Sequence, residues 1–311
     1  MSLRIIFMGT PQFAVPSLQK FYEAGYDIAA VVTAPDKPAG RGMQLSQSAI
    51  KKYALENNLK ILQPEKLKSL DFIEELKSLK AELQVVVAFR MLPEIVWNMP
   101  PMGTINLHAS LLPHYRGAAP INWAIINGEK ETGVTTFKLQ HEIDTGNILL
   151  QEKIKITDDE TAGTLHDKMM NVGAGLLLHT IEKLEKGNLK EVEQLSGGSD
   201  QHSANIRQAP KIFTEDCEIN WNKSVDEIYN LIRGLSPYPT AFIFLNGKKL
   251  KIFSSKKEKT NEANEPGKMI TDHKTFLKFA ATDGFISVTE IQMEGKKKMK
   301  IDDFLRGWRE S

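Results

Sequence analysis

The chain has 311 residues, 41% hydrophobic and 8% aromatic, and a formal net charge of +1. It can therefore bury a sizeable core, and its length predicts two domains. Its single cysteine, Cys217, excludes an intrachain disulfide and a cysteine-rich metal site. No apolar run approaches the ~20 residues of a membrane span, and the run Leu3–Phe7 is too short for a secretory leader, so we expect a cytoplasmic protein without membrane contact.

Strand-like and helix-like segments alternate along the first part of the chain. Runs of β-branched and aliphatic residues predict strands at 3–8, 28–33, 83–89, 104–108 and 134–139. Apolar residues at helical spacing predict helices at 14–23, 48–57 and 72–79. A longer helix is predicted over 162–186, with Thr161 as its N-cap and Gly187 as its C-terminal stop. The alternation predicts an α/β fold with a doubly wound, mainly parallel, Rossmann-like sheet.

The glycine after the first strand, Gly9, raises the question of dinucleotide binding. The segment Gly9–Ala14 supplies only one of the three glycines of the pyrophosphate fingerprint, and Pro11 removes one backbone N–H from the loop. An NAD(P)-dependent oxidoreductase is therefore disfavoured.

The chain changes character after the long helix. Residues 195–201 are polar and glycine-rich, and they form the best linker candidate. Strand-like runs then dominate, at 241–245, 250–253, 275–280 and 285–293, separated by turn signals such as Asn246-Gly247. This pattern predicts a small β-barrel. We expect a catalytic domain at 1–189, a linker at 190–207 and a second domain at 208–311.

Three polar residues form a set that suits acyl transfer. Asn106 and His108 alternate with apolar residues in the predicted strand 104–108, so they point to the same side near its end, and Asp144 follows 36 residues after His108. An amide can stabilise an oxyanion, an imidazole can relay a proton, and a carboxylate can support the imidazole. Taken singly, each has a structural explanation: a hydrogen-bonded histidine, or an Asx-turn at Asp144-Thr145-Gly146.

The stretch Asn106–Pro113, with Arg116-Gly117 and Asp144-Thr145-Gly146, resembles the signature of the folate-dependent formyltransferases. The resemblance implies 10-formyltetrahydrofolate as co-substrate, an amine as acceptor and no metal. It assigns catalysis to Asn106, His108 and Asp144. It also implies contacts with tetrahydrofolate by Ser110, Leu111, Leu112 and Pro113.

Two further stretches, Met8–Pro16 and Pro35–Gly42, resemble the family members that act on initiator methionyl-tRNA, as does the length of the tail. In those members the tail is an OB-like barrel that binds tRNA, and the loop corresponding to Pro35–Gly42, here with Lys37 and Arg41, inserts at the acceptor stem. The chain departs from the pattern at Met43-Gln44, where a basic pair is usual.

A second departure lies in the segment that should line the pterin pocket. Phe89 and Arg90 stand where relatives commonly have Tyr-Gly. Phe89 keeps the ring and loses the hydroxyl, and we count both residues among the predicted folate contacts.

The tail is basic, since residues 248–311 hold 15 Lys and Arg against 10 Asp and Glu. Such clusters can neutralise phosphates, although solvated hairpin tips would look the same. With the resemblance, we expect tRNA contacts by Lys248, Lys249, Lys296, Lys297 and Lys298.

Three alternatives remain open. A sugar-nucleotide or other small-amine formyltransferase would share the catalytic stretch, a 10-formyltetrahydrofolate hydrolase would use water as acceptor, and a non-catalytic tRNA-binding protein would keep only the basic tail. Nothing in the sequence demands a dimer, so we expect a monomer.

Overall fold

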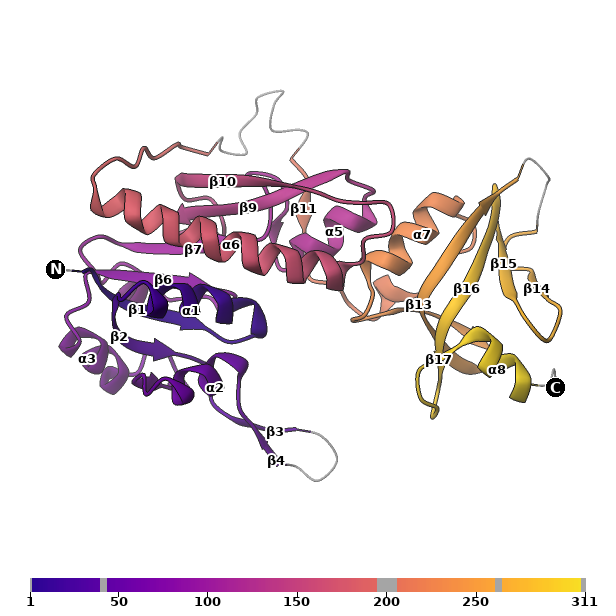
Figure 1. Ribbon diagram of the computed structural model, residues 1–311, viewed down its shortest axis with the longest axis horizontal. Coiled ribbons are helices and arrows are strands. Elements are labelled where there is room, and N and C mark those ends of the chain that lie inside the picture. Colours follow the sequence, from indigo (N-terminus) through magenta and orange to yellow (C-terminus); the bar gives the residue numbers. More distant parts are fainter. Residues whose placement is uncertain (1, 40–43, 195–205, 261–264, 309–311) are drawn as a thin grey trace. The chain divides into compact units, whose positions relative to one another are not determined.

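The computed structural model describes residues 2–39, 44–194, 206–260 and 265–308 (Figure 1). The chain divides into two compact units. The first comprises Met1–Arg116, Gly133–Ile154 and Asp167–Gln208, and the second comprises Gly117–Thr132, Lys155–His166 and Ala209–Ser311. Two short internal segments thus group with the tail. The predicted domain limits at 1–189 and 208–311 stay a prediction.

The first unit is built on a seven-stranded sheet with the order β10-β9-β7-β6-β1-β2-β5. Its strands are β1 (Arg4–Gly9), β2 (Asp27–Val32), β5 (Ile61–Leu62), β6 (Leu83–Val87), β7 (Thr104–His108), β9 (Glu131–Lys138) and β10 (Ile148–Lys155). The strands from β7 to β5 pair in parallel, and β9 is antiparallel to β7. The predicted mainly parallel sheet is confirmed.

Helices cover both faces of this sheet, which makes it doubly wound as predicted. On one face, Ile6, Met8 and Val86 pack with residues of α3 (Leu70–Ser78) and α4 (Glu94–Trp97). On the other face, Phe7 meets Phe21 of α1 (Val15–Glu23), and Leu107 lies under Gly173 of α6 (Ala162–Glu185). Figure 1 shows α6 running along β7 and β9. Burial on both faces explains why β1 and β6 are almost wholly apolar.

Local signals set several boundaries. α6 ends one residue before its predicted limit, Thr161 Oγ1 accepts a hydrogen bond from the N–H of Thr164 (3.2 Å), and Gly187 has a φ of 65°. The strand predicted to reach Phe89 ends at Val87, because Ala88 adopts a left-handed conformation with a φ of 48°.

A hairpin occupies part of the predicted Pro35–Gly42 loop. It consists of β3 (Lys37–Ala39) and β4 (Gln44–Ser46) and precedes α2 (Ala49–Glu56). In Figure 1 this hairpin projects from the edge of the first unit that holds α2. Arg41, a predicted tRNA contact, lies outside the described residues.

The second unit contains a mostly antiparallel sheet with the order β12-β13-β16-β15-β14, to which β17 adds by pairing with β16. Its strands are β12 (Ala241–Leu245), β13 (Lys248–Lys259), β14 (Met269–Thr271), β15 (Leu277–Ala281), β16 (Gly284–Met293) and β17 (Met299–Lys300). β13 carries register shifts near Ile252 and Ser254, which bend the sheet around a single apolar core. The architecture agrees with the small barrel-type domain expected from the sequence.

Helices α5 (Pro120–Ile126), α7 (Val225–Gly234) and α8 (Ile301–Gly307) were not predicted. α7 begins with a capping box, in which Ser224 and Glu227 satisfy each other's backbone N–H groups. The remaining short elements are the 3-10 helices η1 (Gln12–Ala14) and η3 (Glu215–Cys217) and the paired strands β8 (Arg116–Gly117) and β11 (Gln208–Ala209). None of the helices in the described part of the chain is both long enough and apolar enough to cross a membrane.

Candidate active site

The candidate site lies at the carboxyl end of β7, within the first unit. Asn106 is aligned with Val86 of the parallel neighbour β6 and with Phe137 of the antiparallel neighbour β9. Leu107 faces the opposite side, under α6. Alternation therefore places Asn106 and His108 on one face, as predicted. In open α/β sheets, ligands bind beyond this end of the strands.

His108 is buried, and both of its ring nitrogens have a defined environment. Nε2 donates a hydrogen bond to the carbonyl oxygen of Tyr115 at 2.8 Å, since a carbonyl oxygen can only accept. In the neutral ring Nδ1 is then the unprotonated nitrogen, and it lies 3.7 Å from Oδ2 of Asp144. The Phe137 ring meets the imidazole edge to face at 6.5 Å. The carbonyl of Tyr115, rather than Asp144, therefore orients the ring.

The Asp144 carboxylate is only 12% exposed, and the local chain conformation aims it at His108. Asp144 has a φ of 56° and Tyr115 a φ of 60°, so both residues that flank the imidazole adopt left-handed backbone conformations. Such conformations are rare outside glycine and cluster at functional sites. The predicted proximity of His108 and Asp144 is thus realised by two unusual turns.

Asn106 is half-buried, and its side-chain amide has no hydrogen-bond partner among the residues that the structure describes. The buried side-chain atoms that lack a hydrogen-bond partner in the described residues do not include the Asn106 amide, so water or a ligand can reach it. The amide N–H groups are therefore available to an oxygen atom placed between Asn106 and His108.

Two residues that the sequence patterns did not single out, Thr135 and Gln151, hold the loop after β7 through hydrogen bonds to its backbone. Thr135 Oγ1 donates to the carbonyl of Ser110 at 2.6 Å, and Gln151 Nε2 donates to the carbonyl of Leu112 at 2.9 Å. Ser110 and Leu112 are buried, and Ser110 Oγ donates to the carbonyl of His114. Leu111 and Pro113 are half-buried. Folate contact by these four residues stays a prediction.

Arg90 was unexplained by the sequence, and the structure gives it partners. Its guanidinium donates hydrogen bonds to the carbonyl oxygens of Pro64 and Glu65, and it lies 5.7 Å from the centre of the Phe89 ring. Arg90 thereby ties the loop after β6 to the loop after β5, at the same end of the sheet as His108.

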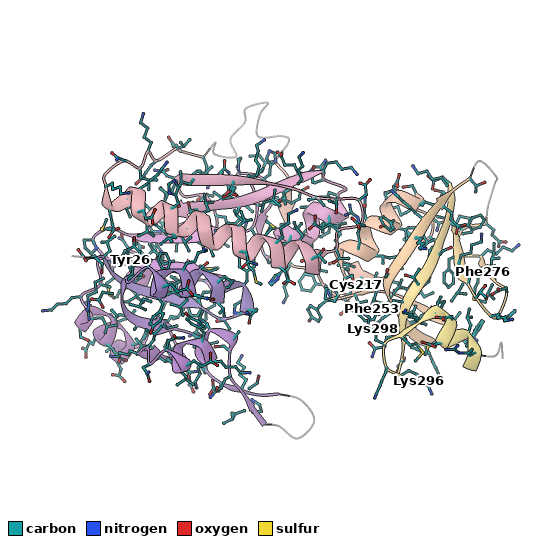
Figure 2. All side chains as sticks on the ribbon, in the orientation of Figure 1. Tyr26, Cys217, Phe253, Phe276, Lys296 and Lys298 are labelled. Atoms are coloured by element: carbon teal, nitrogen blue, oxygen red, sulfur yellow. The ribbon has the colours of Figure 1, made fainter. Side chains whose placement is uncertain are left out.

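The predicted tRNA-binding lysines lie in both units, and all of them except the half-buried Lys249 are exposed. Lys37 lies on β3, whose base is held by an ion pair between Lys51 Nζ and Asp36 Oδ2 (2.6 Å). In the second unit, Lys296 and Lys298 lie in the turn after β16, as Figure 2 shows. Lys298 pairs with Glu290 at 2.8 Å and stacks on Phe253.

The remaining tRNA candidates are neighbours on β13. Lys248 is exposed, whereas Lys249 Nζ lies 3.9 Å from the centre of the Phe242 ring. No group of three or more metal-ligating side chains occurs in the described ranges.

Comparison with known proteins places this geometry in a family. Residues 3–181 match the family model described as formyl transferase, and residues 211–309 match that of the formyl transferase C-terminal domain. The chain is 54% identical to the methionyl-tRNA formyltransferase of Phocaeicola vulgatus over 99% of this chain and 97% of that protein. It is 51% identical to the enzyme of the same name from Bacteroides fragilis, over 98% and 95%.

Solved structures share the fold. The sugar 3N-formyltransferase WlaRD, crystallised in the presence of dTDP and 5-N-formyl-THF, aligns with a TM-score of 0.66 at 23% identity, over 96% of this chain and 100% of that one. HypX from Aquifex aeolicus in complex with tetrahydrofolic acid aligns with a TM-score of 0.67 at 17% identity, over 100% of this chain and 49% of that one. At such identities the likeness concerns the fold. Both domain models and the full-length relatives establish that the chain belongs to the formyl transferase family.

Proposed function

We propose that this protein transfers the formyl group of 10-formyltetrahydrofolate to the α-amino group of initiator methionyl-tRNA. The full-length relatives at 51–54% identity carry the name methionyl-tRNA formyltransferase. The structural observation that carries the proposal is the ring of His108, whose Nε2 is engaged by Tyr115 and whose Nδ1 faces the Asp144 carboxylate.

The donor set fits the proposed reaction. The Asn106 amide, which has no partner among the described residues, can donate a hydrogen bond to an oxygen that gains negative charge. Nδ1 of His108 can accept the proton that the amine must lose. The apolar Phe89 and the loop 110–113 border the same end of the sheet and would hold the pterin. The formyl donor supplies an activated carbonyl carbon.

The reaction can be written as a balanced acyl transfer. An α-amino group has a pKa of about 8, so a useful fraction is neutral near pH 7 and its nitrogen attacks the formyl carbon. The carbonyl oxygen becomes an oxyanion, to which the Asn106 amide donates. The new C–N bond leaves the nitrogen positive, and its proton passes to Nδ1 of His108. The bond from the formyl carbon to the donor nitrogen then breaks, and the imidazolium returns the proton to that nitrogen.

Asp144 stabilises the charged intermediate state of His108. With protons on both ring nitrogens, the imidazolium is bounded by the Tyr115 carbonyl and by the Asp144 carboxylate. Two acceptors around a buried cation lower its free energy in a site of low polarity. The role assigned to Asp144 is therefore electrostatic support of the imidazolium.

The basic residues support a nucleic-acid acceptor. Lys37, Lys248, Lys249 and Lys296–Lys298, together with Arg41, would neutralise phosphates of the tRNA. All residues that the proposal gives to the reaction come from one chain, so a monomer suffices. As an enzyme of translation it would act in the cytoplasm.

One assay tests the proposal. Purified protein is supplied with 10-formyltetrahydrofolate and with initiator methionyl-tRNA, free methionine, an amino sugar nucleotide or water alone, and formylated product is measured. We expect formylmethionyl-tRNA at a kcat/KM at least about 100-fold above any small amine, because phosphate contacts add binding energy. Comparable formylation of a sugar nucleotide, or release of formate without an amine, would overturn it.

A further inference from the structure

Gln194 is a buried polar residue that the proposed mechanism does not use. It belongs to the first unit, follows α6, and is only 5% exposed. Its side-chain oxygen and nitrogen are both occupied. Nε2 donates to the carbonyl oxygens of Asp144 (3.0 Å) and Gly146 (2.6 Å), and Oε1 accepts from Arg116 (2.6 and 3.2 Å). Full use of a buried amide indicates a fixed orientation.

The two carbonyls bound by Gln194 belong to the turn that aims Asp144 at His108. Asp144 has a φ of 56°, a left-handed conformation that is less favourable for a residue with a side chain than for glycine. Such a conformation persists only where surrounding contacts hold it. One amide nitrogen that bridges the carbonyls of residues 144 and 146 holds the peptide planes 144–145 and 146–147. The first of these planes begins at Asp144, so the bridge restrains the backbone from which the Asp144 side chain projects.

The other side of this turn is closed by close packing. A side chain at Gly146 would meet the carbonyl oxygen of Lys138 at 1.6 Å, so the turn lies directly on β9 there. The adjoining chain is also tied to the segment that leads to Gln194. Ile148 and Val192 exchange two backbone hydrogen bonds of 2.8 Å, and Glu191 pairs with Lys138 and Asn147. Gln194 thus lies at the end of a short segment that is paired with the chain after the Asp144 loop.

Gln194 also fixes a cation beside the same loop. Its Oε1 holds the half-buried guanidinium of Arg116. Burial lowers the pKa of Arg116, whereas the charges of Asp144 and Glu142 raise it. A single amide therefore orients both the turn that carries the Asp144 carboxylate and the Arg116 guanidinium, whose charge interacts with that carboxylate.

We propose that Gln194 is a positioning residue for formyl transfer, acting through Asp144. It rests on the proposed function. By bridging the carbonyls of Asp144 and Gly146, Gln194 holds the carboxylate at its working distance from Nδ1 of His108. Misplacement of a supporting group by about 1 Å can cost on the order of 100-fold in rate, so loss of the bridge should appear in kcat.

Two substitutions separate the bridge from the contact with Arg116. Gln194→Met keeps the volume and removes every hydrogen bond. Gln194→Glu keeps an acceptor for Arg116 but sets a carboxylate oxygen against the two carbonyl oxygens. We expect both variants to lose kcat by about 10- to 100-fold, with the KM for methionyl-tRNA changed less than about threefold. A Gln194→Glu variant with nearly full kcat would show that Asp144 does not depend on the bridge, which overturns the proposal.

Gln84→Met is the matched control. Gln84 is also buried, in β6, and accepts a hydrogen bond from Thr104 Oγ1, but it lies at the amino end of the sheet. The Gln84→Met variant should lose thermal stability as the Gln194→Met variant does, but it should keep its kcat. Equal losses of kcat in the two variants would indicate general loosening of the domain and would contradict a positioning role.

A double-mutant cycle supplies the decisive readout. If Gln194 acts through Asp144, then Gln194→Met should cost less than about threefold once Asp144 is replaced, in Asp144→Asn/Gln194→Met compared with Asp144→Asn under single-turnover conditions. Full additivity of the two losses would overturn the proposal. Failure of this inference can be distinguished from failure of the proposed function. Asp144→Asn with full activity would refute the catalytic site itself, whereas Gln194→Met with full activity beside an inactive Asp144→Asn would refute only the role of Gln194.

Discussion

Nδ1 of His108 lies 3.7 Å from Oδ2 of Asp144, beyond hydrogen-bonding distance but within range of a strong electrostatic interaction in a buried site. The ring itself is oriented by the carbonyl of Tyr115. We therefore expect Asp144 to act on the charge of the imidazole rather than on its orientation. This relationship sets the first prediction.

Asp144→Asn should lower kcat by about 10²- to 10⁴-fold and leave the KM for methionyl-tRNA nearly unchanged, because the imidazolium loses its counter-charge while the shape of the loop is kept. Initial rates of formylation over a range of tRNA concentrations measure both constants. Glu142→Gln, an exposed change on the same loop, is the control and should retain kcat. Equal activity of the two variants would remove Asp144 from the mechanism.

Asn106→Asp should lower kcat by about 10²- to 10³-fold with little change in melting temperature. The new carboxylate has the size of the amide but cannot donate a hydrogen bond, and it repels an oxyanion. Stability should hold because the amide has no partner within the described residues. Parallel measurement of kcat and of thermal unfolding checks this. A large fall in melting temperature with a small fall in kcat would assign Asn106 to structure instead.

Arg90→Lys should raise the KM for the folate co-substrate roughly fivefold and leave kcat unchanged. An ammonium group cannot reproduce the two hydrogen bonds to the carbonyls of Pro64 and Glu65, which are worth about 1 kcal/mol, so the Phe89 ring beside it would be held less well. Lys66→Ala, an exposed change on the Pro64 loop, is the control. An unchanged KM would mean that the Phe89 segment does not contact the folate.

The ion pair at the base of the β3–β4 hairpin predicts a pH-dependent stability. Hydrogen bonds from Lys51 and Gln63 lower the pKa of Asp36 below its usual range. A lowered pKa in the folded state stabilises the protein above the unfolded pKa of about 3.9, and this stabilisation is lost as the pH falls through the folded value. Asp36→Asn should therefore be less stable than the unchanged protein at pH 7, and the difference should shrink below about pH 4.

Urea unfolding of both proteins at pH 7, 5 and 3.5 measures this effect. The same variant should raise the KM for methionyl-tRNA, since the hairpin carries Lys37. A stability difference that stays constant down to pH 3.5 would show that the charge of Asp36 is not responsible.

Lysines in the turn after β16 should contribute unequally to tRNA binding. Lys296 and Lys297 have no ion pair in the described part of the chain, whereas Lys298 already pairs with Glu290 and stacks on Phe253 (Figure 2). Lys296→Glu and Lys297→Glu should each weaken binding and reduce the slope of log K against log salt by about one. Lys298→Glu should change the slope less. Equal slopes in all three variants would contradict this distinction.

Local sequence patterns predicted much of the fold. The alternation in Thr104–His108 predicted the position of β7 and the common face of Asn106 and His108, since side-chain direction in a strand depends only on its period. The cap at Thr161 and the glycine at 187 predicted both ends of α6. α7 was missed although its capping box, Ser224 with Glu227, is a local signal. β10, at Ile148–Lys155, was also missed, because its pairing with β9 is not visible in its own residues.

By itself, the sequence determined which residues could perform acyl transfer and, through resemblance, the family of the reaction. Only the tertiary structure decided how these residues are held. Tyr115 rather than Asp144 orients His108, Arg90 binds backbone carbonyls, and Gln194 holds the Asp144 turn from 50 residues away. Backbone carbonyls have no sequence signature, and a glutamine before a polar segment resembles any surface glutamine. Long-range hydrogen bonds depend on how the chain closes in space, which periodicity does not encode.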